Sequence, residues 1–197
     1  MPRAGVTRER IVTEALVLVD ESGFDNLTLA GIAARLGIRV PSLYKHVTGL
    51  PEVQELVAEH CRLELATTIE TATDQQNGAA ALRSLADAVR QWALTHPGRY
   101  AATVKASSMN QAPTPGDQQA TRVLLQVISG PDTIVDDATI HRARALRAAL
   151  HGFVDLELKQ GFGLPTGIDA SWNWLIAYLI DNILPAPTRS ASSDGAP

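Results

Sequence analysis

The chain has 197 residues, 45% of them apolar, and a formal net charge of −4. This length allows one or two small domains with a sizeable core, and the composition is that of a globular protein. The first residues lack the apolar core of a secretory signal, and no run reaches the roughly 18 apolar residues that a membrane helix needs. The single cysteine, Cys61, excludes an internal disulfide. These features predict a cytoplasmic protein that does not interact with a membrane.

The charge is unevenly distributed along the chain. Residues 1–50 contain six Lys or Arg and five Asp or Glu, whereas the remainder contains eleven basic and sixteen acidic residues. The basic character is therefore confined to the N-terminal end. A small basic patch on an acidic body favours oriented binding of DNA over indiscriminate coating of it.

Apolar residues recur at three- and four-residue spacing from residue 7 to residue 21, which predicts a first helix there. Gly23 is expected to end this helix, and Phe24 is expected to fill the core beneath it. Three basic residues near its start are either contacts for a DNA backbone or simply solvated: Arg3, Arg8 and Arg10.

The stretch from residue 27 to residue 47 predicts two short helices joined by a tight turn. Thr28 can cap the first helix, because its hydroxyl can accept an unsatisfied backbone N–H of the first turn. Gly37 supplies the turn, since glycine adopts left-handed backbone conformations without a Cβ clash. The second helix is expected from Pro41 to His46, because proline suits the first turn of a helix.

Leu43 of this second helix is expected to fill the joint between the two helices, which leaves the opposite face free to enter a DNA major groove. The stretch contains no Asp or Glu, as expected of a surface that meets phosphates. Its basic or titratable residues are Arg35, Arg39, Lys45 and His46. From the pattern alone, the alternative is an ordinary helical hairpin with a solvated basic face.

The rest of the chain reads as six further helices, which makes an all-α protein of about nine helices. They are expected over residues 51–72, 80–95, 97–106, 117–128, 136–160 and 170–184. Asp117 is a plausible N-cap of the fourth of these. We expect a DNA-binding domain over residues 1–49, a ligand-binding and dimerisation domain over 50–184, and a disordered tail over 185–197.

Residues 7–57 resemble the DNA-binding domain of TetR-type transcriptional repressors. The residues that carry the resemblance are Gly23-Phe24, Leu27-Thr28, Ala33, Leu36-Gly37-Ile38 and Pro41-Ser42-Leu43-Tyr44-Lys45-His46-Val47. The resemblance implies a rigid three-helix head whose third helix reads the major groove. It implies DNA contacts from Thr28, Arg39, Val40, Pro41, Ser42, Tyr44, Lys45 and His46. The chain departs from the family at Leu50-Pro51-Glu52, where family members often carry a phosphate-binding Lys.

Residues 146–158, which include His151-Gly152-Phe153-Val154, resemble a C-terminal regulatory domain found in a branch of the same family. The resemblance implies that the last two helices pack against a second subunit as a four-helix bundle. The expected interface of this homodimer is Leu146, Leu150, Phe153, Trp172, Leu175, Ile176, Leu179, Ile180 and Ile183. The alternative is that this apolar stripe is buried within one subunit.

The resemblance also implies a pocket for a small-molecule effector between the helices of the C-terminal domain. The candidate ligand-binding residues are Trp92, His96, Tyr100, Thr103, Met109, Phe153 and Trp174, and plain core packing is the alternative for each of them. Few charges fall at inward positions, so a hydrophobic or weakly polar ligand is expected. Cys61 is expected to be a buried, inert thiol, with a redox sensor as the alternative.

The sequence therefore predicts a DNA-binding transcriptional regulator, a repressor that a small hydrophobic ligand releases from a palindromic operator. A helical enzyme is the first alternative, but we find neither a His spacing typical of metal sites nor a GxSxG or phosphate-loop motif. We therefore expect no enzymatic activity and no cofactor. A helical protein-interaction module is the second alternative, and it leaves the basic turn around Lys45 unexplained.

Overall fold

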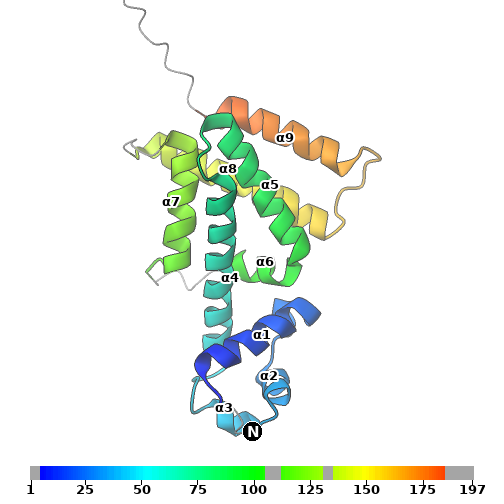
Figure 1. Ribbon diagram of the computed structural model, residues 1–197. Coiled ribbons are helices and arrows are strands. Elements are labelled where there is room, and N and C mark those ends of the chain that lie inside the picture. The colour runs from blue at the N-terminus through cyan, green and yellow to red at the C-terminus, as the bar shows by residue number, and fades with distance from the viewer. Residues whose placement is uncertain (1–4, 105–111, 131–134, 185–197) are drawn as a thin grey trace, which may run out of the picture.

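The computed structural model describes residues 5–104, 112–130 and 135–184. Over these residues the chain is entirely helical, with nine α-helices and one short 3-10 turn, which confirms the predicted fold class. Figure 1 shows a small head of three helices at one end of the molecule and a larger helical body at the other, with one long helix running from the head into the body. None of the helices in the described ranges is long and apolar enough to cross a membrane.

The head consists of α1 (Arg8–Ser22), α2 (Leu29–Leu36) and α3 (Val40–Leu43). The side chain of Thr28 accepts a hydrogen bond from the backbone N–H of Gly31, so it caps α2 as the sequence predicts. Gly37 ends α2 in a left-handed conformation with φ of 65°. A single core joins the three helices, and it contains Ile11, Ala15, Val19, Phe24, Leu27, Ile32, Ala33, Leu43 and Val47.

The body is built around α4 (Leu50–Thr73), the long helix that leaves the head. Five further helices pack around the far part of α4 or on one another. They are α5 (Gly78–Thr95), α6 (Pro97–Val104), α7 (Pro115–Ser129), α8 (Asp137–Leu158) and α9 (Ile168–Ile183). The predicted tail and the end of the predicted sixth helix lie outside the described residues.

The predicted helix boundaries differ from the observed ones by up to three residues, and two of these differences affect named residues. The second helix of the turn motif ends at Leu43 instead of His46, and residues 44–46 form a turn. The helix predicted to begin at Asp117 begins at Pro115, and its N-cap is Thr114. Asp117 is instead the third residue of a capping box, in which Thr114 and Asp117 satisfy each other's backbone N–H groups.

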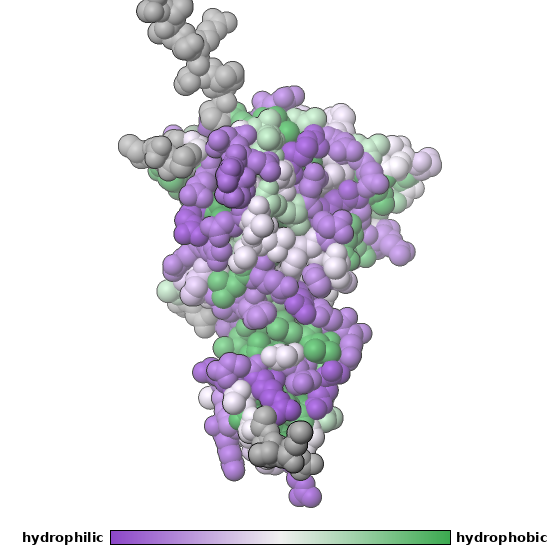
Figure 2. Space-filling model, viewed as in Figure 1, coloured by the Kyte–Doolittle hydropathy of each residue, from purple (hydrophilic) through white to green (hydrophobic). Residues whose placement is uncertain are grey.

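Helix α6 lies between the head and the body, directly against α1 (Figure 1). A Cβ atom added at Gly98 of α6 would lie 2.2 Å from the backbone oxygen of Val19, so only glycine permits this approach. The face seen in Figure 2 is mostly hydrophilic, with a belt of hydrophobic surface at the height of α1. The head is therefore packed against the body through α6 as well as joined to it through α4.

Candidate DNA-binding surface and ligand pocket

The predicted DNA-contact residues all lie at the end of the molecule farthest from the body, around α2 and α3 (Figure 1). None of the eight side chains is buried, and Tyr44 is 57% exposed. Leu43 and Val47 are 0% and 3% exposed and anchor this segment to the head core. Because the anchors point inward, their neighbours are held toward solvent on a rigid support, which is the geometry a groove-reading helix requires.

Fewer basic side chains of this surface are available to DNA than the sequence suggests. Arg35 donates hydrogen bonds to Glu14 at 2.9 Å and to Glu21 at 3.1 Å, so its charge is used to join α2 to α1. Arg39 and Lys45 form no ion pair with any described residue. These two cations therefore remain available for phosphates, whereas Arg35 is structural.

Glu52 occupies the first turn of α4, where the resembled family often has a Lys. Its carboxylate accepts hydrogen bonds from the Thr48 backbone N–H at 2.6 Å and from the Thr48 hydroxyl at 2.8 Å, and it pairs with Arg8 of α1. The backbone N–H of Thr48 holds the pKa of the Glu52 carboxyl below its usual value. The residue thus stabilises the N-terminus of α4 through the helix dipole and replaces a cation with an anion.

A cavity of about 450 Å³ lies between α4, α5, α6, α7 and α8, and we call it the central pocket. Most of its wall is apolar, and its size is that of a pocket for a small organic ligand. Its lining consists of Arg62, Leu65, Ile69, Leu85, Val89, Tyr100, Thr103, Val104, Ala112, Pro113, Asp117, Ala120, Thr121, Leu124, Arg147, Leu150 and His151.

Two of the candidate ligand-binding residues, Tyr100 and Thr103, line the central pocket. Four others lie elsewhere, and Met109 lies outside the described residues. Trp92 is buried beside His96, with ring centroids 5.6 Å apart, and Phe153 packs against Trp172 at 5.1 Å. Trp174 is 69% exposed on α9 and stacks on Tyr178. For Trp92 and Phe153, the structure therefore favours the core-packing alternative.

A polar group in the central pocket was not predicted. The Tyr100 hydroxyl and Nδ1 of His151 share a hydrogen bond of 3.1 Å that connects α6 to α8. Burial raises the pKa of Tyr100 to about 12, so the hydroxyl keeps its proton at neutral pH. Arg147 lies one turn before His151 on the same face of α8 and also lines the pocket.

Arg62 of α4 is an exception to the expectation of few inward charges, because it is only 7% exposed. Its guanidinium lies 2.8 Å from Glu55, 3.4 Å from Glu59 and 3.5 Å from Asp117. Glu59 in turn accepts the backbone N–H of Gly116 at 2.9 Å. The spacing of residues 55, 59 and 62 places them on one helix face, and that was the signal available in the sequence.

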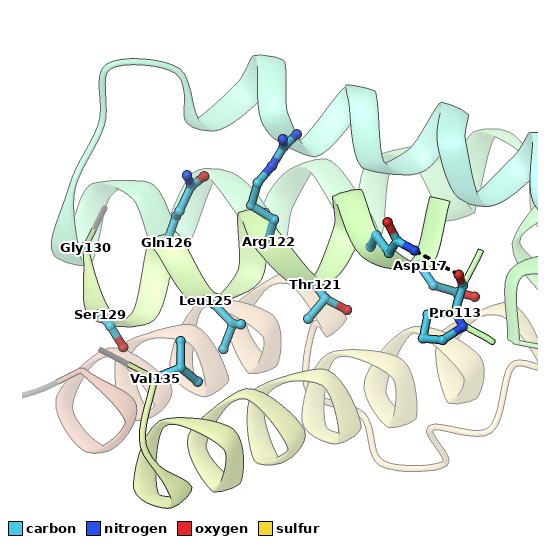
Figure 3. Close-up of a pocket in the computed structure, with 10 residues that line it drawn as sticks. Pro113, Asp117, Thr121, Arg122, Leu125, Gln126, Ser129, Gly130 and Val135 are labelled. Atoms are coloured by element: carbon cyan, nitrogen blue, oxygen red, sulfur yellow. Dashed lines mark hydrogen bonds between the residues drawn. The ribbon is translucent and has the colours of Figure 1, made fainter. Parts of the chain in front are cut away.

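A second depression, of about 480 Å³, runs along the outer side of α7. Figure 3 shows Leu125 and Val135 between α7 and the beginning of α8, while Arg122 points toward α4, where it pairs with Glu70 at 3.1 Å. Most of the remaining lining is polar, namely Asp117, Gln118, Thr121, Gln126 and Ser129. This groove is more open to solvent than the central pocket, which five helices surround, so the central pocket is the better ligand site.

The predicted dimer-interface stripe is largely buried within the single chain. Leu146, Leu150, Trp172, Ile176, Leu179 and Ile183 are each at most 7% exposed. The Trp172 indole N–H donates to Asp87 of α5 at 2.7 Å, which fixes α9 to the body. On α8 and α9, the surface left for a second copy includes the half-buried Phe153, Leu175 and Ile180 of the predicted stripe. It also includes exposed residues, among them Ala145, Ala148, Gly152, Leu156, Trp174 and Tyr178.

Residues 82–179 match the family model for the tetracyclin repressor-like C-terminal domain. The HTH-type transcriptional regulator YobS of Bacillus subtilis is 28% identical over 93% of this chain and 95% of its own length. The HTH-type transcriptional regulator Rv0681 of Mycobacterium tuberculosis is 32% identical over 79% of this chain and 72% of its own length.

The fold is also found in a solved structure of a TetR variant from Acinetobacter baumannii in complex with minocycline. That structure has a TM-score of 0.67 and 20% identity, covering 90% of this chain and 96% of that one. Together with an exposed helix-turn-helix surface on a helical body, the sequence relationships settle the assignment. The chain belongs to the TetR family, and it is a DNA-binding transcriptional regulator.

Proposed function

We propose that the protein is a homodimeric repressor that binds a palindromic operator and is released from it by a small molecule in the central pocket. The observation that carries this proposal is the position of α6. Tyr100 of this helix lines the pocket, and the preceding residue, Arg99, pairs with Asp20 of α1 at 2.6 Å. A displacement of α6 by a ligand would therefore be transmitted directly to the head.

The proposed DNA contacts come from the exposed side of α2, α3 and the turn after α3. Arg39, Lys45 and Tyr44 would bind phosphates or base edges, and Val40 and Pro41 would contact thymine methyl groups because they have no donors. Thr28, Ser42 and His46 complete the set. Support comes from the exposure of these residues and from the rigid anchoring of α3 by Leu43.

Dimerisation supplies the second reading head. Two heads are needed to bind two half-sites about 34–36 Å apart, one helical turn of DNA. The exposed aromatic residues Trp174 and Tyr178 of α9, which are 69% and 52% exposed, are the surface we assign to the partner subunit. Large apolar groups exposed together favour an interface.

In a dimer of this kind, a ligand would act by shifting the population between two head spacings, one of which fits the operator. The A. baumannii TetR variant was solved in complex with minocycline, and this supports binding of a small molecule by the present protein. A body ligand that leaves operator affinity unchanged would exclude this mechanism.

The decisive experiment is footprinting of the purified protein on the DNA that flanks its own gene, across a series of salt concentrations. We expect a roughly palindromic protected site whose affinity falls as salt rises. Lys45→Gln should weaken protection, and Lys159→Gln, which removes the same charge from the end of α8, should not. Absence of protection at low salt, both there and in a genome-wide selection for bound DNA, would refute the proposal.

A further inference from the structure

We propose that the ligand of the central pocket is an amphipathic organic anion, with its charged group bound by Arg147 and the Tyr100–His151 pair. This inference rests on the proposed function, since it names the class of molecule that would occupy the same pocket. It follows from the balance of charges and hydrogen-bond donors around the cavity.

The charged side chains that line the pocket are not equally available. Asp117 accepts hydrogen bonds from the Thr114 hydroxyl at 2.9 Å and its backbone N–H at 3.2 Å. Arg62 is surrounded by three carboxylates, one of which is Asp117. Arg147 has no ion pair with any residue in the described ranges. Its guanidinium is thus the lining charge that a ligand would neutralise.

Arg147 lies close to the polar pair of the pocket. Burial raises the pKa of Tyr100, and the positive charge of Arg147 acts on it in the opposite direction. The other charge that acts on this hydroxyl is Asp155, whose carboxylate pairs with Lys159 at 2.8 Å. The field at the Tyr100 hydroxyl therefore includes an uncompensated cation.

The Tyr100–His151 pair retains one hydrogen-bond donor after its internal bond is made. A neutral imidazole has one N–H and the phenol has one O–H, but only one of these two protons lies in the bond between them. If the hydroxyl donates to Nδ1, then Nε2–H is left over. If Nδ1–H donates, then the hydroxyl proton is left over. This remaining donor and the guanidinium of Arg147 can together bind a carboxylate.

The remainder of the wall fits an apolar body. Leu65, Ile69, Leu85, Val89 and Leu124 line the cavity on α4, α5 and α7, together with Arg62 and Asp117, whose charges are paired. A volume of about 450 Å³ lies within the range of pockets that bind small organic molecules. A medium-length alkyl or aryl carboxylate matches both the size and the division into polar and apolar parts.

Calorimetric titration of the full-length protein with decanoate, decanol and decylamine tests this assignment. We expect decanoate to bind at least about tenfold more tightly than the alcohol, the amine to bind most weakly, and the affinity for decanoate to fall with salt. Arg147→Gln should reduce the affinity for decanoate by about tenfold and leave the affinity for decanol unchanged. Arg147→Lys should retain part of the affinity.

Arg144→Gln is the matched control, because Arg144 is an exposed residue of α8 that does not line the pocket. It should bind decanoate like the wild type. The inference is overturned if the alcohol or the amine binds as tightly as decanoate, if Arg147→Gln has no more effect than Arg144→Gln, or if hexanoate, decanoate, tetradecanoate and naphthoate all fail to bind.

Operator binding separates this inference from the proposed function. If decanoate binds through Arg147 but leaves operator affinity unchanged, the ligand class stands and release by a pocket ligand fails. If a neutral or cationic compound releases the operator and no carboxylate binds, then the proposed function stands and the ligand class is wrong.

Discussion

Arg99 of α6 donates hydrogen bonds to the carboxylate of Asp20 in α1, from Nε at 2.9 and 3.1 Å and from Nη2 at 2.6 Å. Its Nη1 donates to Glu64 of α4 at 2.8 Å. The hydrogen bonds to Asp20, and then those to Glu64, raise the pKa of the guanidinium above its usual value, so it remains charged. One side chain therefore joins the head to two helices that border the central pocket.

Replacing Arg99 should weaken this connection measurably. Arg99→Gln removes the charge and leaves two carboxylates without their partner, so we expect the free energy of unfolding to fall by about 1–3 kcal/mol. Chemical denaturation followed by circular dichroism measures this change. Arg144→Gln, at an exposed position of α8, should change it by less than about 0.5 kcal/mol. Equal effects of the two variants would show that the Arg99 ion pairs do not stabilise the fold.

Gly98→Ala tests the close approach of α6 to α1 without changing any charge. The added Cβ would lie 2.2 Å from the backbone oxygen of Val19, so α6 must move away from the head. We expect faster hydrogen exchange in α1 and α6 while the far end of α4 is unaffected, as measured by mass spectrometry. Gly163→Ala is the control, because no atom of the described residues lies within 4 Å of a Cβ at that glycine. Unchanged exchange in Gly98→Ala would contradict the packing described here.

Leu43 and Tyr44 are adjacent residues of the proposed DNA-binding surface, and replacing them should have different effects. One replacement should lower stability and the other should lower operator affinity. Leu43 is 0% exposed, so Leu43→Ala should cost about 2–5 kcal/mol of stability by leaving a cavity in the head core. Tyr44 is 57% exposed, so Tyr44→Ala should leave the melting temperature unchanged but lower operator affinity about tenfold. Thermal denaturation and footprinting of both variants provide the comparison. A large loss of stability in Tyr44→Ala would place the side chain in the core instead.

Cys61 should be unreactive in the native protein. Burial raises the pKa of its thiol from 9.0 to about 12, so almost no thiolate is present at neutral pH. Reaction with DTNB at about pH 8 should be much slower in the native state than in guanidinium chloride. The shift also contributes stability that is complete below pH 9.0 and is lost as pH rises toward about 12, because the unfolded thiol ionises first. Equal DTNB rates in the two states would indicate an accessible, low-pKa thiol.

If Trp174 lies in the dimer interface, placing a charge there should convert the dimer to a monomer in solution. Trp174 is 69% exposed, and Trp174→Asp would place a charge in the interface with the partner subunit. We expect the variant to sediment as a monomer under conditions in which the wild type is a dimer, with its circular dichroism spectrum retained. Leu164→Asp, at an 84% exposed position of the loop before α9, is the control. A dimeric Trp174→Asp would move the interface elsewhere.

The head could be predicted almost completely from the sequence because local signals determine it. Thr28, Gly37 and Pro41 each act on the backbone within a few residues, and Leu43 follows from the same pattern. The end of α3 could not be predicted in this way. Four residues are too few to show a helical period, and packing of Val47 in the head core decides the path of the chain there.

In the body, helical periodicity predicts which residues are buried but not which segment or subunit covers them. An apolar stripe on α9 predicts that Trp172 and Ile176 are buried, but it does not say whether the same chain or a second subunit covers them. The pocket residues depend on contacts between distant segments. Tyr100 and His151 are 51 positions apart, and nothing local to either residue indicates their hydrogen bond.

The charged cluster around Arg62 stiffens one wall of the central pocket. Arg62 and Glu59 fasten the first turn of α7 to α4, and a Cβ at Gly116 would come within 3.0 Å of the α4 backbone. These two helices therefore form a stiff wall. On the opposite wall, α6 is held to α8 by the Tyr100–His151 hydrogen bond and to α4 by the Arg99–Glu64 ion pair. Under the proposed function, a ligand in this cavity would act on the head most directly through α6, because this short helix lines the pocket and also packs against α1.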